Sequence, residues 1–233
     1  MTISCLQWDS NFFGLRIGKA EIYSVDDIES LQNMELELRN QYDLIYIFNC
    51  INKKVDFATL VDVKVDYAKT VEAKEYNTHV HSYENNSCTE QLYRLSLISG
   101  QHSRYNIDKK FPEGSYEALY RRWIEQSVCK NLADDVLVYI DNSIEYGMVT
   151  YRINKEDNTA RIGLVAVDDM IQGKGIGSSL VSSLENLLNK QGIDKLYVST
   201  QEDNNKACMW YEKNGFSVDS KVEIYHWWIN ENR

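Results

Sequence analysis

Three glycines alternate with other residues in the hexapeptide Gln172-Gly173-Lys174-Gly175-Ile176-Gly177. A strand-like apolar run covers residues 160–167 before it, and a helix-like run covers residues 178–188 after it. Glycines let a backbone approach an anion closely, and the first N–H groups of a helix donate to that anion along the positive end of the helix dipole. The sequence therefore predicts a phosphate-binding turn between a strand and a helix.

The glycine spacing separates this turn from two common nucleotide loops. A dinucleotide fingerprint reads Gly-x-Gly-x-x-Gly, and a P-loop ends in Gly-Lys-Ser/Thr. Here Gly173, Gly175 and Gly177 alternate and Lys174 is followed by glycine, so neither pattern fits. Glycine triplets also occur at ordinary helix entries, and the turn alone leaves that structural role open.

Composition indicates a globular protein. The 233 residues are 43% hydrophobic and 26% charged, enough for one large domain or two modest ones. A net charge of −10 without a Lys/Arg stripe disfavours nucleic acid as a partner. No apolar run approaches the roughly 20 residues of a membrane span and no signal peptide is recognisable, so we expect a cytoplasmic protein. Five scattered cysteines without a Cys-x-x-Cys pair favour reduced thiols, and we expect no metal.

Hydrophobic periodicity predicts alternating helices and strands. From residue 113 onward their order is typical of an α/β unit. Residues 6–20, rich in Trp, Phe and Gly, are interpreted as an ordered loop that buries its rings, and residues 76–90 as a loop near a domain border. The predicted helices are 26–40, 116–131 and 178–188, and the predicted strands are 43–49, 61–67, 93–97, 136–141, 144–153, 160–167, 195–200 and 222–229.

Two motifs resemble the Gcn5-related N-acetyltransferase (GNAT) superfamily. Gln172-x-x-Gly175-x-Gly177 is similar to its acyl-CoA pyrophosphate loop, and Tyr211-Glu212-x-x-Gly215-Phe216, which follows a strand and an asparagine, is similar to its helix end. Over roughly residues 115–230 the resemblance implies an α/β, GNAT acyl-CoA N-acyltransferase fold. It also implies acetyl-CoA as the co-substrate.

Shorter motifs resemble the bacterial dTDP-fucosamine (TDP-4-amino-4,6-dideoxygalactose) N-acetyltransferases. They are Trp8-Asp9-Ser10-Asn11-Phe12-Phe13-Gly14, Ser103-Arg104-Tyr105 with Asp108 and Phe111, Trp123-Ile124-x-x-Ser127, and Tyr225-His226-Trp227-Trp228. This resemblance implies a smaller N-terminal α/β domain, residues 1–98, that contributes to a sugar-nucleotide site, and an acetyltransferase domain, residues 99–233. It implies acetylation of the amine of a nucleotide-linked, dTDP-type amino-dideoxysugar for surface polysaccharide synthesis, and a homodimer.

The superfamily resemblance also implies roles for single residues. Tyr211 is the expected general acid for the departing CoA thiolate, since a phenol with a pKa near 10 is a suitable donor, although a tyrosine here can also simply pack on its helix. Asn204 is expected near the pantetheine arm or as a helix N-cap. The remaining cofactor-binding residues are Val165, Ala166 and Val167 through their backbone, and Gln172, Gly173, Lys174, Gly175, Ile176 and Gly177 at the pyrophosphate.

For the acceptor, Arg104 is expected to meet a diphosphate, because a guanidinium pairs bidentately with phosphate. Trp8 and Phe12 could stack on a base or sugar or could pack in the core. His226 is placed at the acceptor site by its terminal motif. No spacing singles out a general base; the candidates are Glu72, Glu75, His79, His81 and His226, each of which could equally be an ordinary polar residue.

Two other functions remain open at this point. One is a GNAT acetyltransferase for a protein N-terminus or an aminoglycoside, and the other is a silent acyl-CoA-binding module. The sequence leaves undecided which sugar is used, where its amine lies, whether the nucleotide is TDP or UDP, and the oligomeric state.

Overall fold

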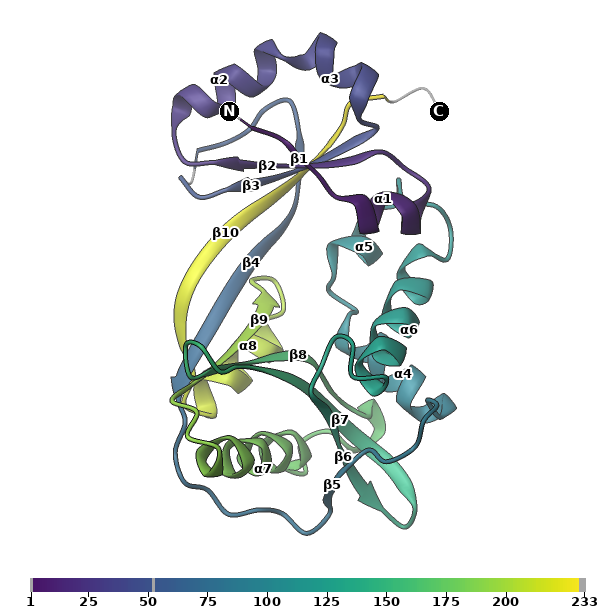
Figure 1. Cartoon of the computed structure of the whole chain (residues 1–233), viewed down its shortest axis with the longest axis vertical. Coiled ribbons are helices and arrows are strands. Elements are labelled where there is room, and N and C mark those ends of the chain that lie inside the picture. Colours follow the sequence, from purple (N-terminus) through teal and green to yellow (C-terminus); the bar gives the residue numbers. More distant parts are fainter. Residues whose placement is uncertain (1, 52, 231–233) are drawn as a thin grey trace.

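A single mixed β-sheet organises the chain (Figure 1). The structure is a computed structural model that describes residues 2–51 and 53–230. Within these residues, ten strands pair in the order β1-β2-β3-β10-β4-β9-β8-β7-β6-β5, and only the pairs β2–β3 and β8–β9 are parallel. The strands are β1 (Ser4–Cys5), β2 (Ile17–Ile22), β3 (Leu44–Asn49), β4 (Thr59–Thr70), β5 (Val80–Ser82), β6 (Asp135–Asp141), β7 (Ile144–Asn154), β8 (Thr159–Val167), β9 (Lys195–Gln201) and β10 (Ser217–Trp228).

Helices occupy several of the connections, and polar side chains cap some of their first turns. Ser24 forms a capping box with Asp27 at α2, and Thr89 Oγ1 accepts a 3.0 Å hydrogen bond from the Leu92 N–H at α4. The helices are α1 (Gln7–Phe13), α2 (Val25–Asn33), α3 (Glu35–Gln41), α4 (Glu90–Ser99), α5 (Arg104–Ile107), α6 (Ser115–Val128), η1 (Asp169–Ile171, a 3₁₀ turn), α7 (Ile176–Lys190) and α8 (Asn205–Lys213).

Residues 93–97, predicted as a strand, lie inside helix α4, so that prediction was wrong. Leu92, Leu95 and Ser96 are buried at helical spacing, and Thr89 caps the helix three residues before Leu92. A five-residue alternation fits either period, and the cap and the wider spacing decide for the helix.

The N-terminal segment also differs from its prediction. Residues 7–13 form helix α1 rather than a loop, and Gly14 ends it with φ +67°, a left-handed conformation that suits glycine. Phe13 is buried, but Trp8 is 48% exposed, so ring burial holds for only part of the motif. The helix predicted over residues 26–40 is divided into α2 and α3 at Met34.

Both faces of the sheet are covered (Figure 1). Neighbouring residues of β7 point to opposite faces: Val149 packs in the cluster with Leu180 and Leu184 of α7, whereas Met148 packs in the cluster with Leu95 of α4 and Ile124 of α6. Near the other end of the sheet, α2 and α3 cover the opposite face from α1 and α5.

Strand β4 connects the two halves of the chain. It pairs with β9 on one side and with β10 on the other, and β10 in turn pairs with β3. Strands from both sides of the boundary expected between residues 98 and 99 thus alternate in one sheet. The division into residues 1–98 and 99–233 stays a prediction.

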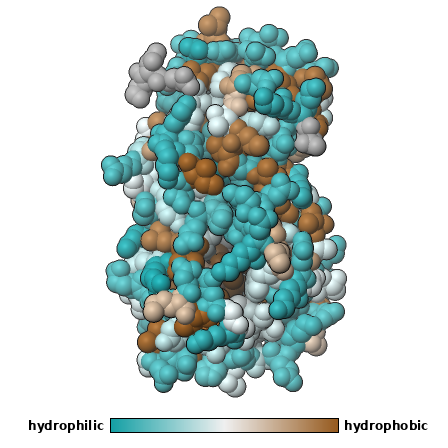
Figure 2. All heavy atoms as spheres, turned by 180° about the vertical axis from the view of Figure 1, so that it is seen from behind, coloured by the Kyte–Doolittle hydropathy of each residue, from teal (hydrophilic) through white to brown (hydrophobic). Residues whose placement is uncertain are grey.

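The surface seen in Figure 2 is mainly hydrophilic, with apolar side chains gathered in separate groups. Among the helices of residues 2–51 and 53–230, none has the length and apolar character needed to cross a membrane.

Candidate active site

Strands β8 and β9 run side by side for only part of their length. Residues 159–162 pair with residues 195–198. Beyond them, residues 163–167 keep only β7 and residues 199–201 keep only β4 as neighbours among the described strands, so β8 and β9 diverge. We call this divergence the β8–β9 wedge. Its facing edges present backbone amides, to which an extended, amide-bearing ligand can pair as an added strand does.

A β-bulge lies where the wedge begins. The β7–β8 register shifts just before Tyr151, which leaves one extra residue in β8. The Leu164 N–H donates to Thr150 Oγ1 at 2.8 Å, and Gly163 makes room for that hydroxyl, since a Cβ there would lie 2.8 Å from it. Bulges redirect backbone groups next to active sites. Residues 165–167, the predicted pantetheine and thioester donors, follow this bulge directly.

The glycine loop ends at the start of helix α7. Gly173 and Gly175 have φ of +83° and +81°, conformations that favour glycine. Gly177 lets the Trp210 indole approach, because a Cβ on Gly177 would lie 3.0 Å from it. No described side chain caps α7, so its first N–H groups are available to an anion at the positive end of the helix.

Side chains around this loop have distinct surroundings. Gln172 Nε2 donates to Asp169 Oδ1 at 2.7 Å, and Lys206 donates to Gln172 Oε1, so this glutamine braces the loop. Lys174 is exposed and available to an anion. Ile176 is buried, which leaves its backbone as the group that can face a ligand.

Asp168, which the sequence analysis did not single out, holds the other end of the loop. Its buried carboxylate accepts hydrogen bonds from the Met170 N–H at 3.0 Å, from Gln91 Nε2 at 2.8 Å and from Arg94. The hydrogen bond from Arg94 lowers the pKa of the Asp168 carboxyl. Helix α4 is thereby fixed to the segment that leads into the glycine loop.

Helix α8 carries the next two predicted residues. Asn204 is the N-cap, and its Oδ1 accepts a 3.1 Å hydrogen bond from the Ala207 N–H. Tyr211 lies on the same helix and is 4% exposed, with its ring centre 5.6 Å from those of Tyr67 and Phe216. Burial raises the pKa of the Tyr211 phenol, which therefore stays protonated at neutral pH.

A second group of polar residues lies on the α5 side of the sheet, and we call it the β4–α5 cluster: Tyr46, Asp62, Arg104 and His226. The Arg104 guanidinium carbon lies 5.2 Å from the Tyr46 ring centre, and the His226 ring stacks on Tyr46 at 4.9 Å. Arg104 donates to Tyr105 Oη at 2.6 Å. Each member keeps one buried atom without a hydrogen-bond partner in the described part of the chain: Tyr46 Oη, Asp62 Oδ1, Arg104 Nε and His226 Nε2.

His226 is oriented by a carboxylate. Its Nδ1 lies 2.6 Å from Asp108 Oδ2, and the Trp228 indole N–H donates to the same oxygen at 2.8 Å. Burial lowers the pKa of His226, so the imidazole is neutral at pH 7. Because a carboxylate only accepts, Nδ1 carries the proton and Nε2 presents a lone pair.

Aromatic rings connect this cluster to the surface. Trp8 stacks on Phe12 with ring centres 5.1 Å apart, Phe12 meets Phe13 edge-on at 5.0 Å, and Phe13 stacks on Tyr105 at 5.5 Å. The structure thus brings Phe12, Arg104 and His226 to one aromatic region, with the half-exposed Trp8 at its rim.

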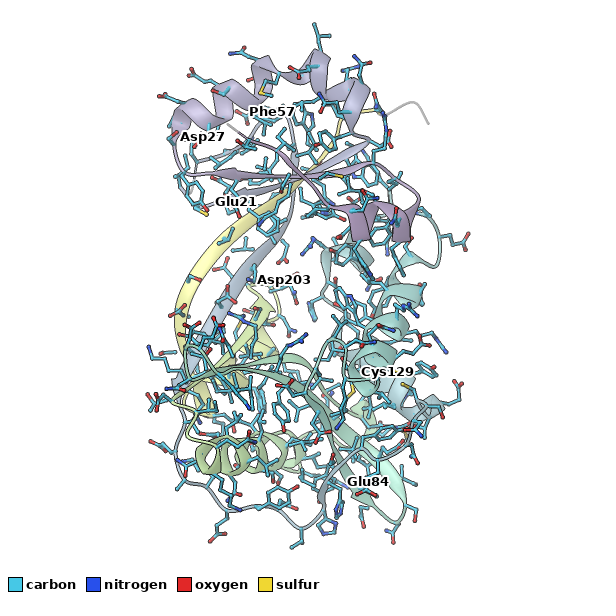
Figure 3. The ribbon with its side chains drawn as sticks, viewed as in Figure 1. Glu21, Asp27, Phe57, Glu84, Cys129 and Asp203 are labelled. Carbon is cyan, nitrogen blue, oxygen red and sulfur yellow. The ribbon has the colours of Figure 1, made fainter. Side chains whose placement is uncertain are left out.

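Asp62 of β4 is 8% exposed. Burial raises the pKa of its carboxyl to about 6, against the opposing effect of Arg104. Asp203 raises this pKa further, and Figure 3 shows it beside β4 at the end of β9. His102 Nδ1 lies 3.7 Å from Asp203 Oδ1 and so connects the segment before α5 to the end of β9.

Asp66, four residues further on the same face of β4, is also 8% exposed but has many partners. It accepts hydrogen bonds from Ser199 at 2.5 Å and from Arg161 at 2.8 Å, and Lys64 lies 2.8 Å away. Burial alone would raise the pKa of Asp66, but these three partners outweigh it and hold the pKa at about 2. Arg161 also lines a hollow of about 780 Å³ over β7, β8 and β9.

Of the five general-base candidates, only His226 lies in the β4–α5 cluster. The other four candidates are exposed. Glu72 and Glu75 follow β4, and His79 and His81 lie at β5, the edge strand at the far end of the sheet from β1. Asp62 was missed because alternation in β4 predicts a solvated face for it. Among the described residues, no group of three or more His, Cys, Asp or Glu side chains is arranged to hold a metal ion.

The bulged, diverging strands and the glycine loop at the start of α7 define a GNAT acyltransferase fold. Residues 102–216, just under half of the chain, match the model of the acetyltransferase (GNAT) family.

Solved structures share the fold. A functionally unknown conserved protein from Staphylococcus epidermidis ATCC 12228 is 14% identical, with a TM-score of 0.60 over 90% of this chain and 82% of that one. A GCN5-related N-acetyltransferase from Sphaerobacter thermophilus is 14% identical, with a TM-score of 0.53 over 86% and 66% of the two chains. Both likenesses extend beyond residues 102–216 and include part of the N-terminal half.

Among curated sequences, the uncharacterized protein YxbD of Bacillus subtilis (strain 168) is 31% identical over 91 residues. The match covers 39% of this chain and 54% of that protein. The chain thus spans about half the length of this relative.

Proposed function

We propose that this protein transfers the acetyl group of acetyl-CoA to a primary amine. The observation that carries the proposal is the β8–β9 wedge, which begins at a bulge and leads to the glycine loop and the uncapped start of α7. The wedge suits the two amides of pantetheine, and the loop suits a pyrophosphate. One linear, anionic, amide-bearing molecule thus matches both features.

The chemistry requires a neutral amine, a polarised thioester carbonyl and a proton for the thiolate. Those backbone N–H groups of residues 165–167 that do not bond to β7 face the wedge, where they are suited to the carbonyl oxygen. Tyr211 is the proposed proton donor: its buried phenol is protonated at neutral pH, and it lies on the helix that Asn204 caps beside the wedge.

We further propose that the acceptor is a nucleotide-linked amino-dideoxysugar of the dTDP type, used in surface polysaccharide synthesis. Arg104 and Asp62 are close enough for each charge to shift the pKa of the other, and each has a buried atom that lacks a partner among the described residues. Together they complement an acceptor with an anionic diphosphate and a cationic amine. Trp8 and Phe12 offer rings for a base or sugar at the rim. The homodimer stays a prediction.

Thiol release from acetyl-CoA tests this proposal directly. The acceptor panel comprises dTDP-amino-deoxysugars, UDP-amino sugars, a peptide with a free N-terminus and an aminoglycoside. Turnover confined to a nucleotide sugar supports the full proposal. Turnover with the peptide or the aminoglycoside alone keeps acetyl transfer and rejects the sugar acceptor. Binding of acetyl-CoA without turnover of any amine rejects the enzyme and leaves a silent acyl-CoA-binding module.

A further inference from the structure

The β4–α5 cluster contains more unsatisfied polarity than a folded core tolerates without a reason. Four of its buried atoms lack a partner among the described residues, and each such atom costs about 1–3 kcal/mol when nothing replaces the lost water. The four side chains come from β3, β4, α5 and β10, and the last two of these elements are distant in sequence from the first two. Four buried polar atoms without partners, contributed by four different elements, indicate a site where a polar ligand would supply the missing hydrogen bonds.

The strand registers show which member lies nearest to the wedge. Extending the β8–β9 register past the pair Ile162–Val198 places Val165 level with the last residues of β9. There Gln201 pairs with Lys64 of β4. At about 3.3 Å per residue, Asp62 lies about 7 Å further along β4.

His226 lies considerably further from the wedge. It pairs with Thr59, five residues from Lys64, which corresponds to about 17 Å along β4. A general base must come within hydrogen-bond reach of the reacting amine, directly or through one water. The registers therefore favour Asp62 over His226.

The backbone next to Asp62 is irregular in a way that supports this role. Ile224 of β10 pairs with Asp62, but the following Tyr225 pairs with Leu60, so Val61 is an extra residue in β4. A bulge of this kind reorients neighbouring side chains and is common beside active sites. Asp66, on the regular part of the same strand, has three partners, whereas Asp62 keeps Oδ1 free.

We infer that Asp62 binds the ammonium group of the acceptor and takes its proton before acetyl transfer. This inference rests on the proposed acetyltransferase function and adds the general base that the sequence did not reveal. The carboxylate has a pKa of about 6, raised by burial, so it is ionised at neutral pH and more basic than an exposed aspartate. The groups that influence this titration are Arg104 of α5, Asp203 after β9, Lys64 of β4 and Gln201 of β9, and Tyr120 of α6 lies nearby.

The proton balance of the step is simple. One proton of the ammonium moves to Asp62 Oδ1, and the neutral nitrogen attacks the thioester carbonyl carbon. The C–N bond forms, the C–S bond breaks as the tetrahedral intermediate collapses, and the nitrogen loses its second proton, which replaces the proton that Tyr211 gives to the thiolate. The thiolate gains one proton, so the products are an amide and the CoA thiol, with one proton left on Asp62 for release to water.

The test compares Asp62→Asn with wild type across pH 5–9, using an amine that wild type acetylates. We expect kcat to fall about 10²–10³-fold while the KM for acetyl-CoA stays within twofold, because only the proton acceptor is removed. The rise of kcat/KM through a pKa near 6 should disappear in this variant. Asp62→Glu retains a carboxylate and should recover part of the rate and the pH-dependent rise. Asp66→Asn is the matched control, with kcat expected within threefold of wild type.

Three results would overturn the inference. The first is a kcat for Asp62→Asn within threefold of wild type with the pH-dependent rise intact. The second is loss of that rise in His226→Gln but not in Asp62→Asn, which would assign the base to the imidazole. The third is wild type that binds acetyl-CoA but acetylates no amine; this rejects the proposed function, and the inference falls with it.

Discussion

Two aspartates on the same face of strand β4 have the same exposure and opposite chemistry. Asp62 and Asp66 are both 8% exposed, yet the first has a pKa near 6 and an unpartnered oxygen, and the second has a pKa near 2 and three donors. Burial raises the pKa of both carboxyls. The presence of partners therefore distinguishes a carboxylate that holds the sheet together from one that is free to react.

The comparison also shows why a hollow alone does not mark a site. Arg161 lines a hollow of about 780 Å³ and donates to Asp66. The Asp66 carboxylate, however, already has three partners. Asp62 lies where strand pairing is irregular and where residues from four elements leave polar atoms open. The more informative sign is unsatisfied polarity next to irregular backbone.

The largest effect is expected for the proposed proton donor on α8, which would act together with Asp62. Tyr211→Phe removes only the phenol oxygen, and we expect kcat to fall about 10²–10⁴-fold because the thiolate loses its acid. Acetyl-CoA binding, measured by calorimetry, should stay unchanged. Tyr197→Phe is the control, since Tyr197 lies on β9 and lines the hollow beside Arg161. A Tyr211→Phe enzyme as fast as wild type would exclude the phenol as the acid.

The next effect concerns stability. Asp66→Asn weakens a carboxylate that accepts from Ser199 and Arg161, and we expect the free energy of unfolding at pH 7 to fall by about 1–3 kcal/mol. Asp62→Asn removes a buried charge without a full set of partners, so its stability should be equal to or greater than that of wild type. Urea unfolding of the three proteins measures both. Destabilisation of Asp62→Asn as large as that of Asp66→Asn would abolish the distinction between the two positions.

The same pair should respond to pH in opposite directions. Asp66 has a depressed folded-state pKa, so its stabilisation is present above about pH 4 and is lost as the pH falls toward 2. Asp62 has a raised folded-state pKa, so its protonated carboxyl favours the folded state. This contribution to stability is fully present below about pH 4 and is lost as the pH rises through 6. Any stability advantage of Asp62→Asn at pH 7 should therefore vanish near pH 4, while the deficit of Asp66→Asn should persist there. Thermal unfolding at pH 4, 5.5 and 7 checks this, and parallel pH curves for the two variants would contradict it.

These differences explain what the sequence could and could not reveal. The glycine loop and the Asn204 cap depend on local chain geometry: residues 172–175 lie directly before α7, residues 176 and 177 begin that helix, and Asn204 caps α8. The surroundings of Asp62 depend on α5, β9 and β10, which are distant in sequence and lie beside β4. The period-two pattern of β4 instead assigns Asp62 to a solvated face. Helix α4 was missed for a local reason, because five alternating residues fit a strand and a helix equally well.

The smallest effect is expected when one of the hydrogen-bond donors to Asp66 is removed. Ser199→Ala removes the hydrogen bond that Oγ donates to Asp66 Oδ1 at 2.5 Å and the one that Oγ accepts from Arg161 at 2.9 Å, and it leaves the contacts of Lys64 and Arg161 with Asp66 in place. We expect a loss of about 0.5–1.5 kcal/mol, the usual worth of such a bond, and an acid-unfolding midpoint shifted to higher pH because the Asp66 pKa rises.

Ser217→Ala is the matched control for this variant. Ser217 is exposed on β10, and within the described part of the chain its hydroxyl makes only a long 3.4 Å hydrogen bond, to the Ala68 carbonyl. Its acid midpoint should therefore stay at the wild-type value, while urea unfolding at pH 7 reports its small cost. If Ser199→Ala leaves the midpoint unchanged, Lys64 and Arg161 alone suffice to hold Asp66 ionised. The contrast with Asp62 would then rest on the two cations within ion-pair distance of Asp66, rather than on the number of hydrogen bonds.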